Sequence, residues 1–419
     1  MPVRRTPRRT GPQLMRWHSV AAATPISETK MSSAPCRDMP GMRGTAVAIV
    51  YAALCAAALL TPAVAQAQAV DSPAPGAVVD YVRQEPGWGG YTDAALLRYV
   101  TSGPTGVPEV ASGVVFTPNG IAPEGGWPVV AWDHGTAGLT PDCSLTTNRA
   151  VNEKTIVESV IDHGYAVVAP DYVGLSADST TTHPYLNSAT EATATTDIVK
   201  AAVAADPTLS STWAVLGASQ GGHAALNTGR IASAQAPRLD FRGTAALAPA
   251  SNIESLFTAA GPWIPTSEIS TSFAPLLAAT LSGLRTTGPD VDVDSYLTPR
   301  GREVVDSVAT ACVNDWGTAT GGAGIADILD RPLSDPAMAE ALRHYMAVPA
   351  SDFDRPIFIA HGTRDTTVPY PLTLTLAAQM STAGTRYELK TYDTDHEGIV
   401  AALADALAFL DTVMNPTAR

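Results

Sequence analysis

The sequence predicts an α/β fold: a mostly parallel central sheet with helices on both faces and an inserted, mainly helical cap. Between residues 127 and 248, short apolar runs of strand length alternate with longer stretches of helical pattern, and this alternation returns from 356 to 414. Residues 250–350 interrupt it with Ala- and Leu-rich helical pieces, several Pro residues and a Gly-rich patch. The 419 residues, 45% of them hydrophobic, suffice for one large core with an insertion.

The first 69 residues have the composition of an export leader. They hold eight basic and two acidic residues, and Arg43 precedes an apolar run over 46–60 that ends in small residues up to Ala67 and Ala69. A positive start, a short apolar middle and a small-x-small end are typical of a secretory signal peptide. We therefore expect residues 1–69 to be a leader, cleaved after Ala67 or Ala69, and the mature protein to be secreted. A retained signal anchor is the alternative, although the run is short for a membrane span.

The charge of the remaining chain limits its partners. The whole sequence has a net charge of −14, and residues 70–419 keep 18 basic residues against 38 acidic ones. This balance argues against nucleic-acid binding and against docking on anionic membranes, both of which need clustered Lys and Arg. We expect a small-molecule or neutral lipid substrate, with no nucleic acid and no stable membrane anchor.

Cysteine usage fits export. Cys36 and Cys55 lie in the leader, so the mature chain keeps only Cys143 and Cys312. Two cysteines in an oxidising compartment suggest one disulfide, which would stabilise the fold by ~2–5 kcal/mol. The alternative is a pair of buried free thiols.

The predicted elements follow from apolar runs and periodicity, in chain order. The first core part spans 70–249, the cap 250–350 and the second core part 351–419. The first part has an extended lead-in over 70–90, strands at 94–100, 110–117, 127–132, 165–169, 213–216 and 243–248, and helices at 148–163, 189–205 and 221–234. The second part has strands at 356–360 and 386–392 and helices at 372–382 and 398–414.

The segment from Gly217 to Gly221 reads Gly-Ala-Ser-Gln-Gly and fits the G-x-S-x-G turn between a strand and a helix. Such a turn exposes the serine hydroxyl, here Ser219, and its glycines let neighbouring backbone segments approach closely. The N–H of Gln220 would point at an oxyanion near the helix N-terminus. A purely structural turn is the alternative. His223, four residues on, is expected to be a helix-surface or packing residue.

Two further residues complete a candidate catalytic triad with Ser219. Asp365 follows the predicted strand 356–360, at the end where an acid must lie to orient a histidine, whereas Asp352 and Asp354 precede that strand. His396 follows the next strand and opens the last helix, and a pKa near neutrality suits it to take and return a proton. The alternatives are that Asp365 is an N-cap or turn residue and that His396 is a helix-cap residue. The order Ser219, Asp365, His396 is that of the α/β-hydrolases.

A second oxyanion donor is expected after the strand 127–132. There, backbone N–H groups of Gly135 or Thr136 could face the serine. His134 is more simply an anchor for this loop than a reacting group.

Several segments together resemble the secretory lipase family, the lipase-A-like branch of the α/β-hydrolases, over roughly residues 72–415. The resemblance implies an acyl-ester hydrolase with a helical cap over its site, catalytic roles for Ser219, Asp365 and His396, a Cys143–Cys312 disulfide, and no metal or cofactor. The segments that carry it are Trp132–Gly138 with Cys143, Pro170–Leu175, His183–Leu186 (His-Pro-Tyr-Leu), Gly217–Gly222 and His361–Asp365.

The sequence thus predicts a secreted carboxylic ester hydrolase, a lipase or esterase, working through an acyl-enzyme. Phe257, Trp263, Phe273 and Leu276–Leu277 are candidates for an acyl pocket in the cap, or else form its core. An acyltransferase or peptidase on the same three residues, or an inactive binding protein on this scaffold, are the rival hypotheses.

Overall fold

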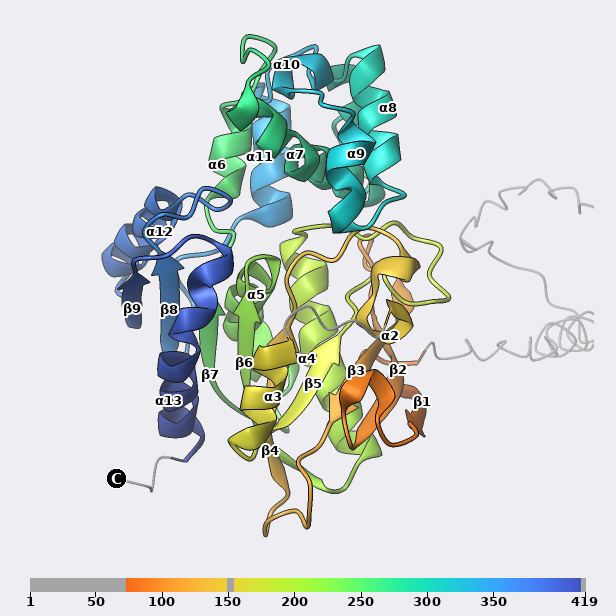
Figure 1. Cartoon of the computed structure of the whole chain (residues 1–419), viewed down its shortest axis with the longest axis vertical. Coiled ribbons are helices and arrows are strands. Elements are labelled where there is room, and N and C mark those ends of the chain that lie inside the picture. The colour runs from red at the N-terminus through yellow and green to blue at the C-terminus, as the bar shows by residue number, and fades with distance from the viewer. Residues whose placement is uncertain (1–72, 149–153, 416–419) are drawn as a thin grey trace, which may run out of the picture. The chain divides into compact units, whose positions relative to one another are not determined.

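The structure is a computed structural model that describes residues 73–148 and 154–415. Nine strands of these residues form one sheet (Figure 1). The strand order is β1-β2-β3-β5-β4-β6-β7-β8-β9. The first four strands of this order, β1, β2, β3 and β5, form three antiparallel pairs. From β5 to β9 in the same order, all neighbouring strands are parallel. The strands are β1 (Val78–Arg83), β2 (Ala94–Ser102), β3 (Pro108–Phe116), β4 (Trp127–Asp133), β5 (Ala166–Pro170), β6 (Leu209–Ala218), β7 (Asp240–Leu247), β8 (Ile357–Gly362) and β9 (Tyr387–Tyr392).

The leader prediction, its cleavage sites and the two leader cysteines lie outside the described residues. Residues 70–90, expected as an extended lead-in, also contain a strand that was not predicted: β1, which pairs with β2 through partners such as Val82 and Leu96. The sequence of this strand has no apolar alternation that would predict it, because the strand lies at the sheet edge. Val79 and Val82 are both exposed there, so burial imposes no apolar alternation.

Helices cover both faces of the sheet, as a mostly parallel sheet requires. On one face pack α4 (Ser188–Ala205), α5 (Gln220–Gln235) and α12 (Tyr370–Ala383). On the other face pack α3 (Lys154–Asp162) and α13 (Leu403–Met414). No helix in the described ranges combines the length and hydropathy that a membrane span requires.

Two predicted helices are shorter than expected. In place of one helix over 148–163, the structure has the short α2 (Leu145–Asn148) and then α3. Residues 149–153 between them lie outside the described ranges. The range 398–414 begins with a 3-10 turn over Glu397–Ala402 before α13 starts. The tighter turn directly follows His396.

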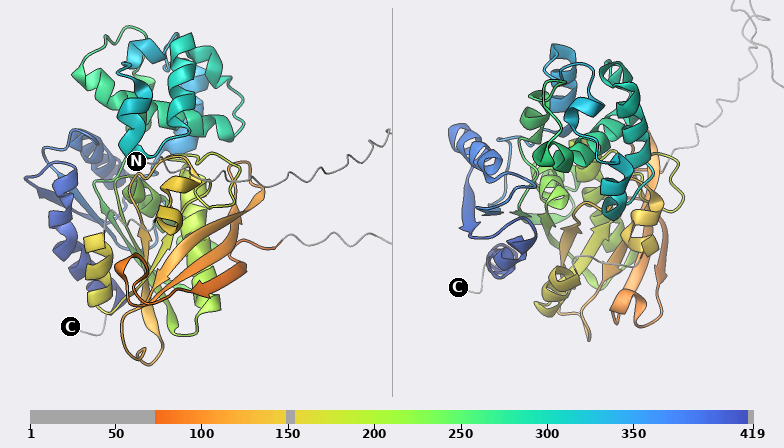
Figure 2. Two further views of the ribbon diagram at one scale, coloured as in Figure 1. Left: turned by 45° about the vertical axis from the view of Figure 1, so that its right-hand side comes forward. Right: turned by 45° about the horizontal axis from the view of Figure 1, so that its top comes forward.

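Between β7 and β8 the chain leaves the sheet and forms the inserted cap, drawn in green to light blue at the top of Figure 1 and from two other sides in Figure 2. Its helices bury their own apolar cluster, which also includes Tyr185 and Leu186 from the sheet domain. The cap contains α6 (Ile253–Thr258), α7 (Glu268–Thr286), α8 (Pro299–Val308), α9 (Trp316–Thr320), α10 (Ile325–Ile328) and α11 (Pro336–Met346), with 3-10 turns at Val293–Tyr296 and Val313–Asp315.

A disulfide joins Cys143, in the 3-10 turn Pro141–Cys143 after β4, to Cys312 in the cap. Backbone contacts accompany it: Gly138 forms a bridge with Cys312, and the N–H of Val313 donates to the carbonyl of Ala137 at 2.9 Å. The loop after β4 is therefore tied both covalently and through its backbone to the cap.

Candidate active site

Ser219 occupies the junction between β6 and α5, where the chain reverses from strand to helix with no intervening loop. Its φ of 57° and ψ of −118° lie outside the regions that a non-Gly residue ordinarily adopts. Such geometry costs about 1–3 kcal/mol and persists only where the surrounding structure enforces it. The N–H of Ser219 donates to the carbonyl of Leu247 in β7 at 2.9 Å, which fixes the turn against the neighbouring strand.

The two glycines of this segment are required by close backbone contacts. A Cβ on Gly217 would lie 2.0 Å from the carbonyl oxygen of Gly221, and one on Gly221 would lie 1.8 Å from that of Asp133. Neither obstacle is a movable side chain. The segment therefore has glycine at these positions because the turn packs directly on β4 and on itself.

Hydrogen bonds connect the three predicted residues in sequence. His396 Nε2 lies 2.8 Å from Ser219 Oγ, and His396 Nδ1 lies 2.6 Å from Asp365 Oδ2. In the neutral imidazole, Nδ1–H donates to the carboxylate and the serine hydroxyl donates to Nε2. The imidazole is thus arranged to accept the serine proton while the carboxylate stabilises the resulting charge.

Asp365 lies just after β8 in a setting that keeps it ionised. Its Oδ1 accepts hydrogen bonds from the backbone N–H groups of Thr367 and Val368 at 2.9 and 2.8 Å. Burial alone would raise the pKa of this carboxyl. Hydrogen bonds from His361, His396 and the Val368 N–H outweigh burial and hold the pKa below its ordinary value. The group is therefore a carboxylate at neutral pH.

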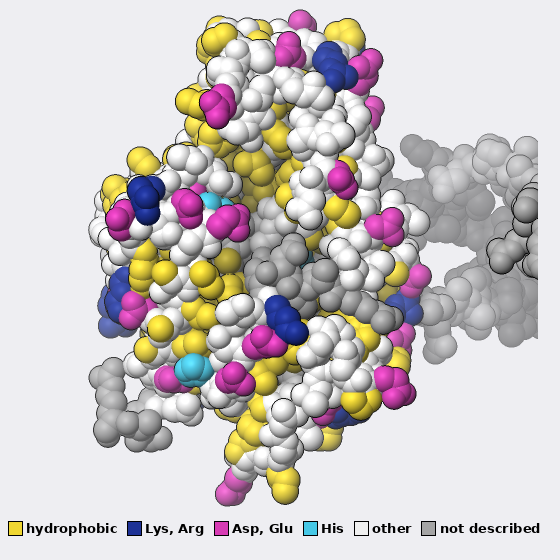
Figure 3. All heavy atoms as spheres, in the orientation of Figure 1, with side chains coloured by type: hydrophobic (Ala, Val, Ile, Leu, Met, Phe, Trp, Pro, Cys, Tyr) yellow, Lys and Arg dark blue, Asp and Glu magenta, His cyan; other side chains and the backbone are white. Residues whose placement is uncertain are grey.

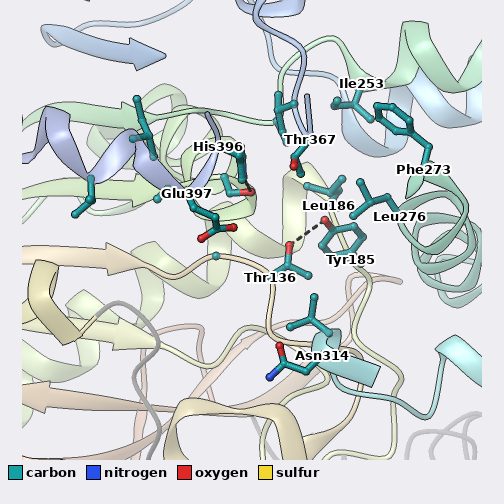
Figure 4. Close-up of a pocket in the computed structure, with 18 of the residues that line it drawn as sticks. Thr136, Tyr185, Leu186, Ile253, Phe273, Leu276, Asn314, Thr367, His396 and Glu397 are labelled. Carbon is teal, nitrogen blue, oxygen red and sulfur yellow. Dashed lines mark hydrogen bonds between the residues drawn. The ribbon is translucent and has the colours of Figure 1, made fainter. Parts of the chain in front are cut away.

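The predicted oxyanion loop reaches the same site. Gly135 and Thr136 line the cavity that contains Ser219 and His396. Thr136 Oγ1 lies 3.0 Å from the hydroxyl of Tyr185, a contact drawn as a dashed line in Figure 4. The ring of His134 is buried, with Nδ1 2.6 Å from the carbonyl of Gly135, so it anchors the loop.

Gln220 is the first residue of α5, where backbone N–H groups have no intrahelical acceptor. The positive end of the helix dipole lies at the same point. Its side chain is buried and bonded to Glu191 and His183, so only the main chain of Gln220 is placed to serve Ser219. This N–H and one from the loop Gly135–Thr136 are the candidate donors to an oxyanion.

The site opens into a cavity of about 720 Å³ between the sheet domain and the cap. In Figure 4, Ile253, Phe273 and Leu276 lie on one side of it and His396 and Glu397 on the other. On the face shown in Figure 3, hydrophobic side chains gather on the lower part of the cap, where it meets the sheet domain. The apolar residues that line the cavity are Ile156, Tyr185, Leu186, Ala218, Ala250, Ile253, Phe257, Phe273, Leu276, Val313, Val368, Ile399 and Val400.

Of the cap residues predicted for an acyl pocket, Phe257, Phe273 and Leu276 line the cavity. Two others do not. Trp263 is 60% exposed on the cap, and Leu277 is buried in the cap's own core. Successive residues of a helix point in directions about 100° apart, so Leu276 and Leu277 cannot both face one cavity.

Sequence reasoning missed several residues around the site. Tyr185 and Leu186 line the cavity, and the only signal for them is the His-Pro-Tyr-Leu segment that contains them. Glu191, which no sequence signal indicated, is fully buried and pairs with His223, which is itself buried in packing, one of the two positions expected for it. Within residues 73–148 and 154–415, no group of three or more His, Cys, Asp or Glu could hold a metal ion.

Comparison with sequence families decides the assignment. A profile of the family described as secretory lipase matches residues 141–411, more than half of the chain. The chain belongs to the secretory lipase family. As a member of this family it is a lipolytic hydrolase of esters, in agreement with the resemblance of its motifs. A search among curated proteins gave no match.

Several solved structures share the fold of this chain. Candida antarctica lipase A is 20% identical with a TM-score of 0.69, over 83% of this chain and 84% of that one. The rice cell wall degrading esterase LipA from Xanthomonas oryzae is 21% identical with a TM-score of 0.68, over 82% and 100%. A putative hydrolase from Legionella pneumophila is 18% identical with a TM-score of 0.68, over 82% and 99%. At these identities the likeness concerns the α/β-hydrolase fold alone.

Proposed function

We propose that this secretory lipase family member hydrolyses carboxylic esters, as a triacylglycerol lipase or carboxylesterase, with Ser219 as nucleophile, His396 as general base and acid, and Asp365 as its orienting carboxylate. The observation that carries the proposal is the unbroken chain of hydrogen bonds from Ser219 Oγ through His396 to Asp365, opening on a cavity. An apolar cavity wall beside a nucleophile suits an acyl chain.

In the first step Ser219 Oγ attacks the ester carbonyl carbon while His396 Nε2 takes the hydroxyl proton. The carbonyl oxygen gains the negative charge and accepts hydrogen bonds from the N–H of Gln220 and one from the loop Gly135–Thr136. Each such donor lowers the barrier by ~3–4 kcal/mol. The intermediate then collapses: the bond from the acyl carbon to the alcohol oxygen breaks, and His396 gives its proton to the leaving alkoxide.

In the second step water attacks the acyl carbon bound to Ser219, and His396 takes one of its protons. Collapse breaks the bond to Ser219 Oγ, which regains a proton from His396, and the carboxylic acid leaves. The ionised Asp365 stabilises the imidazolium in both steps, since it lies 2.6 Å from Nδ1.

The decisive experiment is Ser219→Ala. We expect the turnover of p-nitrophenyl esters to fall by at least ~10³-fold with an unchanged melting temperature, because the hydroxyl is the reacting group. Ser233→Ala, farther along α5, is the matched control and should keep full activity. A fluorophosphonate probe should label the parent protein and the control but not Ser219→Ala. Wild-type turnover in Ser219→Ala would refute the proposal.

We also propose that the protein is exported, with residues 1–69 removed, and that residues 250–350 form a separate cap between the core parts 70–249 and 351–419. The family and the Cys143–Cys312 disulfide support export, because disulfides persist in oxidising compartments. The N-terminal residue of the protein recovered from the culture medium would test the cleavage site.

A further inference from the structure

A buried carboxylate lies beneath the strand–helix turn, and neither the triad nor the oxyanion donors include it. Glu191 is in the first turn of α4 and fully buried. One of its oxygens, Oε1, accepts from Gln220 Nε2 at 2.8 Å and from the N–H of Leu186 at 3.2 Å. The other, Oε2, lies 2.6 Å from Nδ1 of His223. A buried carboxylate is stable only with such hydrogen-bond and charge partners. These partners include the residue that follows Ser219.

The protonation state of His223 follows from its neighbours. Its Nδ1 faces the Glu191 carboxylate, and its Nε2 lies 2.9 Å from the carbonyl of Met346 at the end of α11. Two more distant groups, Ser188 Oγ and Asn227 Nδ2, lie 3.3 Å from the same nitrogen. The nearest group at each ring nitrogen is an acceptor, and only an imidazolium donates from both nitrogens. Glu191 and His223 are therefore a buried ion pair, and the pair fixes the direction in which the carboxylate presents Oε1.

The Gln220 side chain is held from two sides. One Nε2 hydrogen is donated to Glu191 Oε1, and the other is donated to Nε2 of His183, 2.8 Å away. His183 can accept there because its Nδ1 donates to the carbonyl of Val173 at 2.7 Å. With both hydrogens committed, the Gln220 amide has a single orientation.

This matters because Gln220 follows the nucleophile. Its own N–H, a candidate oxyanion donor, belongs to the first turn of α5, where no helical hydrogen bond restrains it. A donor must lie within a few tenths of an ångström of its position in the transition state to stabilise the oxyanion fully. Backbone hydrogen bonds hold Ser219, the residue before Gln220, and the buried side chain of Gln220 is a second anchor that holds Gln220 itself.

We propose that Glu191, oriented by His223, is a positioning residue that fixes the backbone N–H of Gln220 for the oxyanion through the Gln220 side chain. The inference rests on the proposed function. Glu191 does not touch the substrate. It acts through Gln220, so its loss should reduce transition-state stabilisation more than substrate binding.

The test is a double-mutant cycle on purified, full-length protein with p-nitrophenyl esters. Gln220→Met keeps the backbone N–H but removes the amide, and Glu191→Met removes its acceptor. We expect each to lower kcat about 10- to 100-fold with a smaller change in KM. The double variant should be no worse than the poorer single variant, within about threefold, because both changes break the same link. Glu191→Gln keeps an oxygen for Gln220 and can donate to a neutral His223, so it should restore kcat to within about fivefold of the parent.

Asp197→Leu is the matched control, since Asp197 is a buried carboxylate on the same helix that bonds Thr101 and Lys200 instead. It should lower stability and leave kcat unchanged. An alkyl boronic acid, which forms a tetrahedral adduct at the serine, should bind more weakly to Glu191→Met in proportion to its loss of kcat/KM.

Several results would overturn the inference: a wild-type kcat in Gln220→Met, losses that multiply in the double variant, or equal losses in Glu191→Gln and Glu191→Met. Should Glu191→Met not fold, Gln220→Met and Glu191→Gln still decide the matter, the first by its kcat and the second by its retention of activity. Ser219→Ala separates the two proposals. If it keeps turnover, the proposed function fails, whereas its inactivity together with an unaffected Gln220→Met refutes only the role of Glu191.

Discussion

At the scale of single residues, burial decides the chemistry of the histidines around the site. His183 is buried, donates from Nδ1 to Val173 and accepts from Gln220 at Nε2. Burial lowers its pKa from 6.5 to about 4, although the nearby Glu191 carboxylate opposes the shift. A neutral ring is what its two neighbours require. His223, one turn into α5, has the opposite setting, since the Glu191 carboxylate outweighs burial and raises its pKa.

The depressed pKa of His183 predicts acid sensitivity. Well above pH 6.5 the ring is neutral in both the folded and unfolded states. As the pH falls toward 4, only the unfolded state takes up the proton, so up to about 3 kcal/mol of unfolding free energy is lost. Urea unfolding from pH 7 to 4 should show a shallower decline for His183→Asn than for the parent. The control His163→Asn, at an exposed position after α3, should follow the parent. Parallel curves for all three proteins would contradict the buried neutral assignment.

At the scale of elements, the loop after β4 depends on the cap for its position. This loop carries Gly135 and Thr136 into the cavity and then meets the cap at the Cys143–Cys312 disulfide. The residues after Cys312, Val313 and Asn314, line the same cavity. One covalent link thus constrains both the loop that carries the proposed oxyanion donor and a part of the cavity wall.

The disulfide spans a sequence separation of 169 residues, so it should contribute ~2–5 kcal/mol by restricting the unfolded chain. We expect the free energy of unfolding of the double variant Cys143→Ser/Cys312→Ser to be lower by that amount, so that it unfolds at a lower urea concentration. Dithiothreitol should destabilise the parent to the same level and leave the double variant unchanged. A parent protein that is insensitive to dithiothreitol although its thiols react with a labelling reagent would show that the link adds no stability.

At the scale of the whole described unit, the cavity has two chemically different sides. Ser219, Asp365 and His396, the proposed catalytic residues, follow the carboxyl ends of the parallel strands β6, β8 and β9, where α/β proteins place their sites. The cap supplies apolar side chains, Phe257 from α6 and Phe273 and Leu276 from α7. Substrate size should therefore be set by the cap, and the chemistry by the sheet domain.

Filling the cap side should shorten the acyl chain that the protein accepts. For Leu276→Trp we expect kcat/KM for long-chain p-nitrophenyl esters to fall about tenfold or more, with acetate hydrolysis within about twofold of the parent. Leu374→Trp, at an exposed position on α12, is the control and should leave the whole chain-length profile unchanged. Equal losses on short and long esters would place Leu276 outside the acyl path.

Much of this protein could be predicted locally. Apolar runs and helical periodicity predicted the sheet strands from β2 to β9 and the helices around them. A strand or helix that is buried in the core has apolar residues at the positions that face the core, and this pattern can be recognised in the sequence. The edge strand β1 has no such pattern and was missed. The Gly-x-Ser-x-Gly segment, Asp365 and His396 each follow a predicted strand, and the structure places their side chains in hydrogen-bonding reach.

The sequence alone therefore determined the order of the strands from β2 to β9, the turn that needs glycine at 217 and 221, and the three residues that meet at the strand ends. Only the tertiary structure decided the pairing of Glu191 with His223, the anchoring of Gln220, and which of Leu276 and Leu277 faces the cavity. The reason is physical. Periodicity and backbone sterics act between neighbours in the chain, whereas a buried ion pair or a cavity wall depends on how helices far apart in sequence pack together.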